Sequence, residues 1–167
     1  MALSTANLYS AVQPGGSLFG LQASNPVDVR SAYGPEAFPG LYGTKHDSMV
    51  HDKIGGINVF GGGLPLYAEG HRIVGGVGVS GDTSCADHNI AWRVRNILNL
   101  DHLAAADGLA AVPGPASLFA NDPTHPDNII FDITENPNGG TGKSASGFGH
   151  PPCVNSSGSS SLPAVRP

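Results

Sequence analysis

The stretch GGLPLYAEGHRIVGGVGVSGDTSCADHNIAWRVRNILNL, residues 62–100, decides the fold class. Two short apolar runs, residues 64–67 and 72–80, flank a turn signal at 68–70 and predict an antiparallel β-hairpin. The second run contains glycine at 75, 76 and 78, which weakens its strand propensity. Such glycines predict a close approach, and we expect a helix backbone to pack against them.

A helix is expected from about residue 84 to 99. Thr83 or Ser84 can cap it, and Ser84 with Asp87 has the spacing of a capping box. Apolar residues recur at i, i+4, i+7 and i+8, which predicts a buried face made of Ile90, Val94, Ile97 and Leu98. The same pattern places Arg93, Arg95 and Asn96 on the other faces.

The segments on either side are less regular. A short helix is expected at residues 4–13, followed by a long loop to about 53 and a strand at 57–60. Residues 128–133 read as a further strand, and the Gly- and Ser-rich residues 154–167 are predicted to be disordered.

Composition limits the class of protein. The chain has 167 residues, of which 40% are hydrophobic and 13% charged, with Lys+Arg 8 against Asp+Glu 13 and a net charge of −5. This balance excludes a basic nucleic-acid-binding surface, and no apolar run reaches the roughly 18 residues of a membrane span. A glycine-rich α+β domain remains.

Two glycine motifs suggest phosphate binding. Residues 76–81 match G-x-G-x-x-G with Asp101 twenty residues beyond, but Asp101 follows the expected helix rather than a second parallel strand. Residues 142–144 resemble the end of a P-loop, but Pro137 stands where that motif requires glycine. We therefore favour packing and turn roles for both.

Histidines and cysteines are the remaining candidates for chemistry. Among seven histidines, His46–Asp47 and His51–Asp52 are close enough to form a surface metal site, although we favour the interpretation that they are polar loop residues. Cys85 and Cys153 are the two cysteines, and their spacing leaves open both a disulfide and two unrelated thiols. No catalytic constellation emerges.

Three blocks in order resemble the GlcG/HbpS family of small haem-binding proteins. They are GGLPLY at 62–67, GGVGVSGD at 75–82 and ADHNIA at 86–91. The resemblance covers about residues 54–100 closely and implies a profilin-like α+β fold, an antiparallel sheet with flanking helices. Compared with the family, this chain lacks an N-terminal helix and two strands, which predicts exposed sheet edges and oligomerisation.

The C-terminal part resembles an exported subgroup of that family. This resemblance rests on Cys85, the run DNIIFDIT at 127–134 and the closing GHPPC at 149–153. The resemblance implies a disulfide between Cys85 and Cys153 and a periplasmic or secreted full-length parent. It also implies a domain at 1–101 and an extension at 102–153 that wraps it, before the tail at 154–167.

The resemblance implies haem as the cofactor. The candidate axial ligands, in order of preference, are His51, His88 and His46, and no metal beyond the haem iron is expected. The function expected is non-enzymatic storage, sensing or delivery of haem, with a sensor or transport protein as partner. The alternatives are an accessory protein or enzyme of small organic acid or cobalamin-linked metabolism, and a purely structural oligomerising domain.

Overall fold

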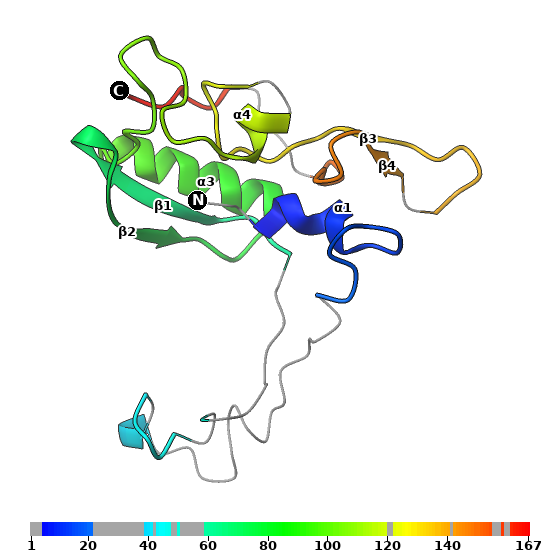
Figure 1. Ribbon diagram of the computed structural model, residues 1–167, viewed down its shortest axis with the longest axis horizontal. Coiled ribbons are helices and arrows are strands. Elements are labelled where there is room, and N and C mark those ends of the chain that lie inside the picture. Colours follow the sequence, from blue (N-terminus) through cyan, green and yellow to red (C-terminus); the bar gives the residue numbers. More distant parts are fainter. Residues whose placement is uncertain are drawn as a thin grey trace.

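The protein is an α+β domain, seen in a computed structural model that describes residues 5–21, 39–41, 43–47, 50, 59–119, 122–140, 142–154, 158 and 161–167. A β-hairpin lies beside the longest helix, and most of the later chain lies above and to the right of these two elements in Figure 1. This arrangement is consistent with part of a profilin-like fold. In chain order the elements are η1 Thr5–Leu8, α1 Tyr9–Val12, η3 Pro39–Leu41, β1 Gly63–Ala68, η4 Glu69–His71, β2 Arg72–Gly78, α3 Ser84–Ile97, α4 Pro115–Phe119, β3 Ile133–Thr134 and β4 Lys143–Ser144.

The hairpin is confirmed. Strands β1 and β2 pair antiparallel from Gly63↔Gly78 to Ala68↔Arg72, and Gly70 turns the chain at a φ of 72°. The other edge of β1 is also occupied, because Tyr67 donates its N–H to Leu100 and accepts from His102. Among the described residues, β2 pairs only with β1.

The close packing expected along β2 is wrong. A Cβ placed on Gly75 would lie 4.0 Å from a Leu66 methyl group, and one on Gly78 would meet nothing within 4 Å. The close approaches instead lie just before β1, where a Cβ on Gly61 would collide with the carbonyl of Ser84. The glycines of β2 therefore mark an open strand, and the glycine-rich run before β1 meets the helix.

Helix α3 is confirmed, and of the two caps expected it is Thr83 that caps it. Thr83 Oγ1 accepts from Ala86 N at 3.3 Å, whereas Ser84 Oγ accepts from Gly61 N at 3.2 Å. Asp87 accepts from the N–H groups of Gly81 and Asp82 at 3.3 and 3.1 Å. The capping box between Ser84 and Asp87 is therefore replaced by contacts that fasten the helix to the loops before it.

The buried face expected for α3 is wrong. Ile90, Ile97 and Leu98 are 47%, 80% and 54% exposed. The face turned inward instead carries residues at i, i+3, i+7 and i+10, namely Cys85, His88, Trp92 and Arg95, all 0% exposed. None of these four is aliphatic, so counting aliphatic side chains selected the opposite face.

Arg95 is buried because it has a buried partner. Its guanidinium makes two hydrogen bonds to Asp127, at 2.7 and 2.9 Å, and Asp127 is 2% exposed. Its central carbon also lies 4.5 Å from the centre of the Trp92 ring. A bidentate pair of this kind, with an aromatic face beside it, offsets much of the cost of removing both charges from water.

Disorder of the tail is also wrong for residues 161–167. Leu162 and Val165 are buried in the main core, and Trp92 Nε1 donates to Pro163 O at 2.8 Å. Arg166 pairs with the buried carboxylate of Asp101. The core therefore joins β1, α3 and the C-terminus through Leu64, Tyr67, Ala91, Trp92, Leu103, Ala104, Leu162 and Val165. The domain boundaries at 101 and 153 stay predictions.

The strand expected at 128–133 reduces to β3, which pairs with β4 at Ile133↔Ser144. Before it, the Asn7 side chain donates to Asn128 O and accepts from Ile130 N, both at 2.9 Å. The Asn7 side chain therefore hydrogen-bonds this backbone segment as a neighbouring strand would, and Ile129 and Ile130 are buried.

The short N-terminal helix is confirmed as η1 and α1, whereas residues 59 and 60 of the strand expected at 57–60 are not in a strand. Residues 57 and 58 lie outside the described residues. The glycine motifs are also placed: 76–81 joins an antiparallel strand to α3, and 143–144 form β4. Among the described residues, no helix is long and apolar enough to cross a membrane.

Candidate functional site

The three histidines proposed as haem ligands have different surroundings. His51 lies outside the described residues, as does the pair His51–Asp52 of the suggested metal site. His46 is exposed on a turn, and its neighbour Asp47 accepts from Gly43 N at 2.7 Å. His88 lies in the first half of α3 and is fully buried. The described residues do not bring His46 and His88 together.

The His88 ring has no hydrogen-bond partner for either nitrogen among the described residues. Its nearest aromatic neighbour is Trp92, with ring centres 6.0 Å apart. The pKa of His88 is lowered to about 4, mainly by burial; the Asp127 carboxylate opposes this shift, and the positive charge of Arg95 adds to it. The ring is therefore neutral at pH 7, with a lone pair on one nitrogen.

A surface hollow of about 580 Å³ lies close to this ring. Its lining is Thr5, Val59, Phe60, Gly61, Gly63, Val79 and Ser80. Gly61 connects the hollow to the helix, because a Cβ on Gly61 would lie 3.0 Å from His88 Cβ. Backbone at Gly61 therefore separates the hollow from the buried ring.

The loop over His88 is fastened by a few hydrogen bonds, one of which runs from Phe60 N to Thr5 Oγ1 at 3.2 Å. Thr5 Oγ1 donates to Phe60 O at 2.7 Å, Gly61 N donates to Ser84 Oγ at 3.2 Å, and Val79 N donates to Gly62 O at 3.0 Å. Opening this loop would break few contacts and would expose an imidazole whose nitrogens are unused.

These residues fit haem in chemistry and in size. A neutral imidazole is a common axial ligand of haem iron, and the hollow falls within the usual volume of ligand pockets. The apolar side chains of Val59, Phe60 and Val79 suit a porphyrin face. Iron would reach His88 only after residues 59–62 move, because the ring is 0% exposed as the loop stands.

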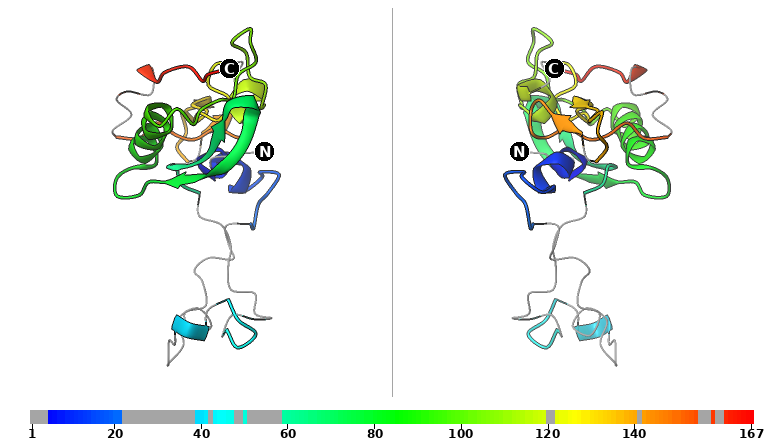
Figure 2. Two further views of the ribbon diagram at one scale, coloured as in Figure 1. Left: turned by 90° about the vertical axis from the view of Figure 1, so that its left-hand side faces the viewer. Right: turned by 90° about the vertical axis from the view of Figure 1, so that its right-hand side faces the viewer.

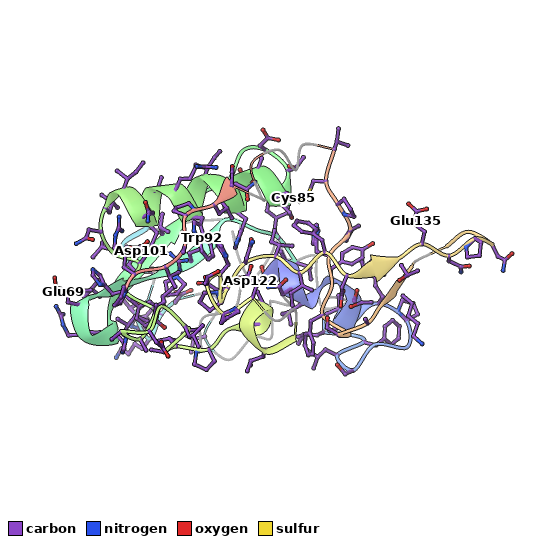
Figure 3. The ribbon with its side chains drawn as sticks, turned by 90° about the horizontal axis from the view of Figure 1, so that it is seen from above. Glu69, Cys85, Trp92, Asp101, Asp122 and Glu135 are labelled. Carbon is purple, nitrogen blue, oxygen red and sulfur yellow. A yellow bond between two sulfur atoms is a disulfide. The ribbon has the colours of Figure 1, made fainter. Side chains whose placement is uncertain are left out.

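The disulfide between Cys85 and Cys153 is confirmed, with Cα atoms 6.0 Å apart. Cys85 lies at the end of α3 nearest to α1, and Trp92 points from the middle of α3 into the molecule (Figure 3). The bridge ties α3 to the C-terminal segment and packs against Ala6 and Ile129.

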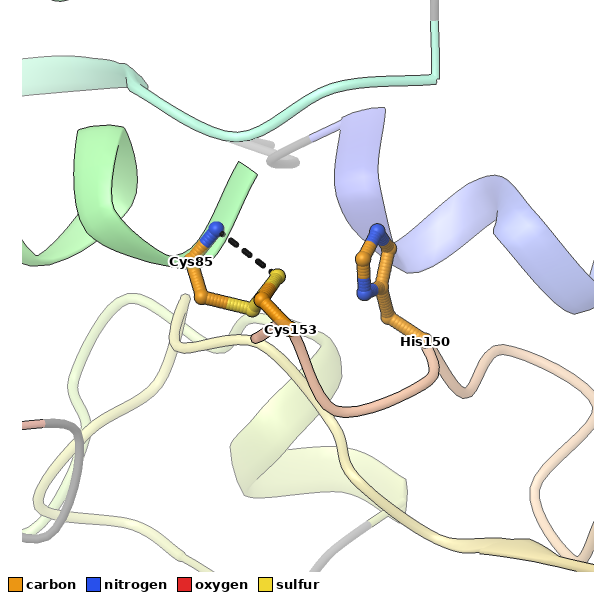
Figure 4. A group of neighbouring side chains, drawn as sticks. All are labelled: Cys85, His150 and Cys153. Carbon is orange, nitrogen blue, oxygen red and sulfur yellow. Dashed lines mark hydrogen bonds between the residues drawn. A yellow bond between two sulfur atoms is a disulfide. The ribbon is translucent and has the colours of Figure 1, made fainter. Parts of the chain in front are cut away.

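Sequence reasoning missed the histidine beside this bridge. One ligand atom each from Cys85, His150 and Cys153 lies within 4.8 Å of the others (Figure 4). The signal was present in the sequence, because His150 precedes Cys153 by three residues in GHPPC.

The fold and site together define a disulfide-linked α+β domain with a surface hollow close to a buried histidine. Residues 1–95 match the family model described as "Haem degrading protein HbpS-like". The chain therefore belongs to the HbpS-like family, which confirms the resemblance found in the three sequence blocks. No curated protein and no solved structure matches the chain.

Proposed function

We propose that this protein binds haem in the hollow beside Gly61, with His88 as the axial ligand, for storage, sensing or delivery. The observation that carries the proposal is a fully buried, neutral imidazole whose ring nitrogens have no hydrogen-bond partner among the described residues. Buried polar groups without a partner are costly, so a bound iron would satisfy a group that the fold otherwise leaves unpaired.

The residues around the hollow have separate tasks in this proposal. Val59, Phe60 and Val79 exclude water from the porphyrin face, and His88 holds its lone pair toward the iron. The family description names haem degradation, so turnover of bound haem is a second outcome to be measured. Bound haem would supply the redox-active iron that such turnover requires.

The proposal places the protein in an oxidising compartment, periplasmic or extracellular, because disulfides form and persist there. The confirmed bridge of Cys85 and Cys153 supports this placement. We also propose self-association through β2, supported by its exposed side chains and by its single paired edge among the described residues. A sensor or transport protein is the further partner proposed.

The test is a haemin titration followed by absorbance in the Soret region. Wild-type protein should give a saturable, red-shifted band, and His88→Ala should lose the shift and weaken binding at least about tenfold. His46→Ala is the matched control and should bind as the wild type does. Circular dichroism of each variant establishes that the fold is retained.

The same titration assigns the ligand if His88 is not involved. Loss of the band in His51→Ala with retention in His88→Ala would transfer the role to His51 and overturn our assignment. A flat titration of folded wild-type protein would overturn haem binding itself. Decay of the band after adding a reductant and oxygen would show degradation rather than storage.

A further inference from the structure

We propose that Cys85, Cys153 and His150 form a binding site for zinc when the disulfide is reduced. Two thiolates and one imidazole are a donor set that Zn²⁺ prefers, and a fourth position remains for water. The three donor atoms already lie within 4.8 Å of one another. Because Zn–S is about 2.3 Å and Zn–N about 2.0 Å, the donors of a tetrahedral site lie roughly 3.5–3.8 Å apart. Once the bridge is broken, the two sulfur atoms must move apart and the His150 ring must turn, and both are side-chain movements (Figure 4).

His150 is held in the form that a metal requires. Its Nδ1 lies 2.7 Å from the carbonyl oxygen of Pro151, and because a carbonyl only accepts, Nδ1 carries the hydrogen. The lone pair therefore resides on Nε2, which Figure 4 shows turned toward α1, so the His150 ring must turn before Nε2 faces the two sulfur atoms. Metal-binding histidines commonly donate the other ring N–H to a carbonyl or carboxylate, and this contact fixes the tautomer. The ring also packs against Tyr9, with ring centres 5.3 Å apart.

The sulfur atoms are placed where a negative charge is favoured. Cys85 is the second residue of α3, at the positive end of the helix dipole. The backbone N–H of Cys85 donates to Cys153 Sγ at 3.2 Å, as the dashed line in Figure 4 shows. Both features stabilise thiolates relative to thiols, and thiolates are the form that binds zinc.

The cluster would stay assembled after reduction, because other contacts hold the segment that carries His150. Ser10 donates through both N and Oγ to Gly149 O, at 3.1 and 2.7 Å. His150 N donates to Ile130 O at 2.8 Å. None of these bonds involves sulfur. Cys153 is partly exposed, which gives a reductant access to the bridge.

The chemistry is a thiol–disulfide exchange followed by metal binding. A dithiol reductant attacks one sulfur of the bridge, becomes a cyclic disulfide, and leaves two protonated cysteines. One Zn²⁺ ion then displaces one proton from each thiol and binds His150 Nε2 without releasing a proton. In the oxidised protein the sulfur atoms are bonded to each other, so the bridge acts as a switch that closes the site.

The test uses the 167-residue chain in the absence of haemin, so that its outcome is separate from that of the haem titration. Reduced and oxidised protein are titrated with Zn²⁺ against a chromophoric chelator, and with Co²⁺ to observe thiolate-to-metal charge-transfer absorbance. Reduced protein should bind one ion per chain and show that absorbance, whereas oxidised protein should do neither. His150→Ala should weaken zinc binding at least about tenfold, and exposed His46→Ala should leave it unchanged.

Three results would overturn the proposal. One is a reduced wild-type protein that binds zinc no better than the variant with Cys85→Ser and Cys153→Ser. Another is unchanged affinity in His150→Ala. The third result applies if the wild-type protein unfolds on reduction. The variant Cys153→His cannot form the bridge but keeps three donors. If this variant folds and does not bind zinc, the site is rejected.

Discussion

The inward face of α3 and the outer strand of the hairpin reverse the usual distribution of polar and apolar residues. The inward face buries His88 and Arg95 completely beside Trp92, whereas β2 leaves Ile73 and Val74 62% and 44% exposed. Figure 2 shows the two regions from opposite sides, with α3 on one side of the hairpin. In these two regions, whether a side chain is buried depends on the contacts available to it rather than on its residue type. Arg95 is buried because Asp127 meets it, and Ile73 is exposed although it is aliphatic.

Removing the charge partner on the inward face should produce the largest effect. Arg95→Met leaves the Asp127 carboxylate buried and unpaired, so we expect a loss of about 3–5 kcal/mol in the free energy of unfolding. Urea denaturation followed by tryptophan fluorescence measures this loss, since Trp92 lies in the same cluster.

The matched control is Arg93→Met, which lies two residues earlier on the same helix but is exposed. We expect it to change the free energy of unfolding by no more than about 1 kcal/mol. The double change Arg95→Met with Asp127→Leu should recover most of the loss, because no charge is then left buried. A double variant as unstable as the single one would mean that packing around Trp92, rather than the unpaired carboxylate, accounts for the loss.

The comparison also explains what sequence could predict. Local rules sufficed where the cause is local: turn residues between two apolar runs predicted β1 and β2, and Thr83 predicted the start of α3. Family resemblance added the bridge between Cys85 and Cys153. Contacts between distant residues were not predictable, because nothing in the local pattern links Arg95 with Asp127 or Trp92 with Pro163.

The candidate site was predicted in the same uneven way. Sequence named His88 as a candidate without placing it inside the molecule, and its burial depends on the glycine-rich run at 59–62. It did not place His150 at the disulfide, since that position depends on the bonds from Ser10 and Ile130 to residues 149 and 150. A donor set assembled from α3 and the C-terminal segment is visible only in three dimensions.

Titrating the inward face should give a smaller, pH-dependent effect. The pKa of His88 is lowered by burial to about 4, below its ordinary value of 6.5, so between these values the unfolded chain binds a proton that the folded chain refuses. Stability should therefore fall as pH decreases through this window. Relative to His88→Phe, which cannot titrate, the wild type should lose about 2 kcal/mol between pH 7 and pH 5.

Urea denaturation at each pH, on both proteins, measures the difference. Burial also lowers the pKa of His150, but that contribution is present in both proteins and cancels. Parallel curves for the wild type and His88→Phe would show that the ring is not held neutral inside the fold, and would remove the support that burial gives to His88 as an iron ligand.

The smallest effect should come from the outer strand. Ile73→Thr keeps a β-branched side chain with good strand propensity at a position that is 62% exposed, so we expect a change within about 0.5 kcal/mol. The same substitution at Ile130, which is 1% exposed, should cost more than about 2 kcal/mol, because it removes packed methyl groups and buries a hydroxyl.

Urea denaturation of the two variants at low and high protein concentration measures both costs. The small cost at Ile73 is expected at low concentration, where β2 has no second chain beside it. The proposed self-association through β2 predicts that this cost rises towards that at Ile130 at high concentration, and a cost that stays small at both concentrations would contradict it. If the cost rises, the exposed strand is a subunit interface, and its aliphatic residues follow the same rule as the buried face of α3.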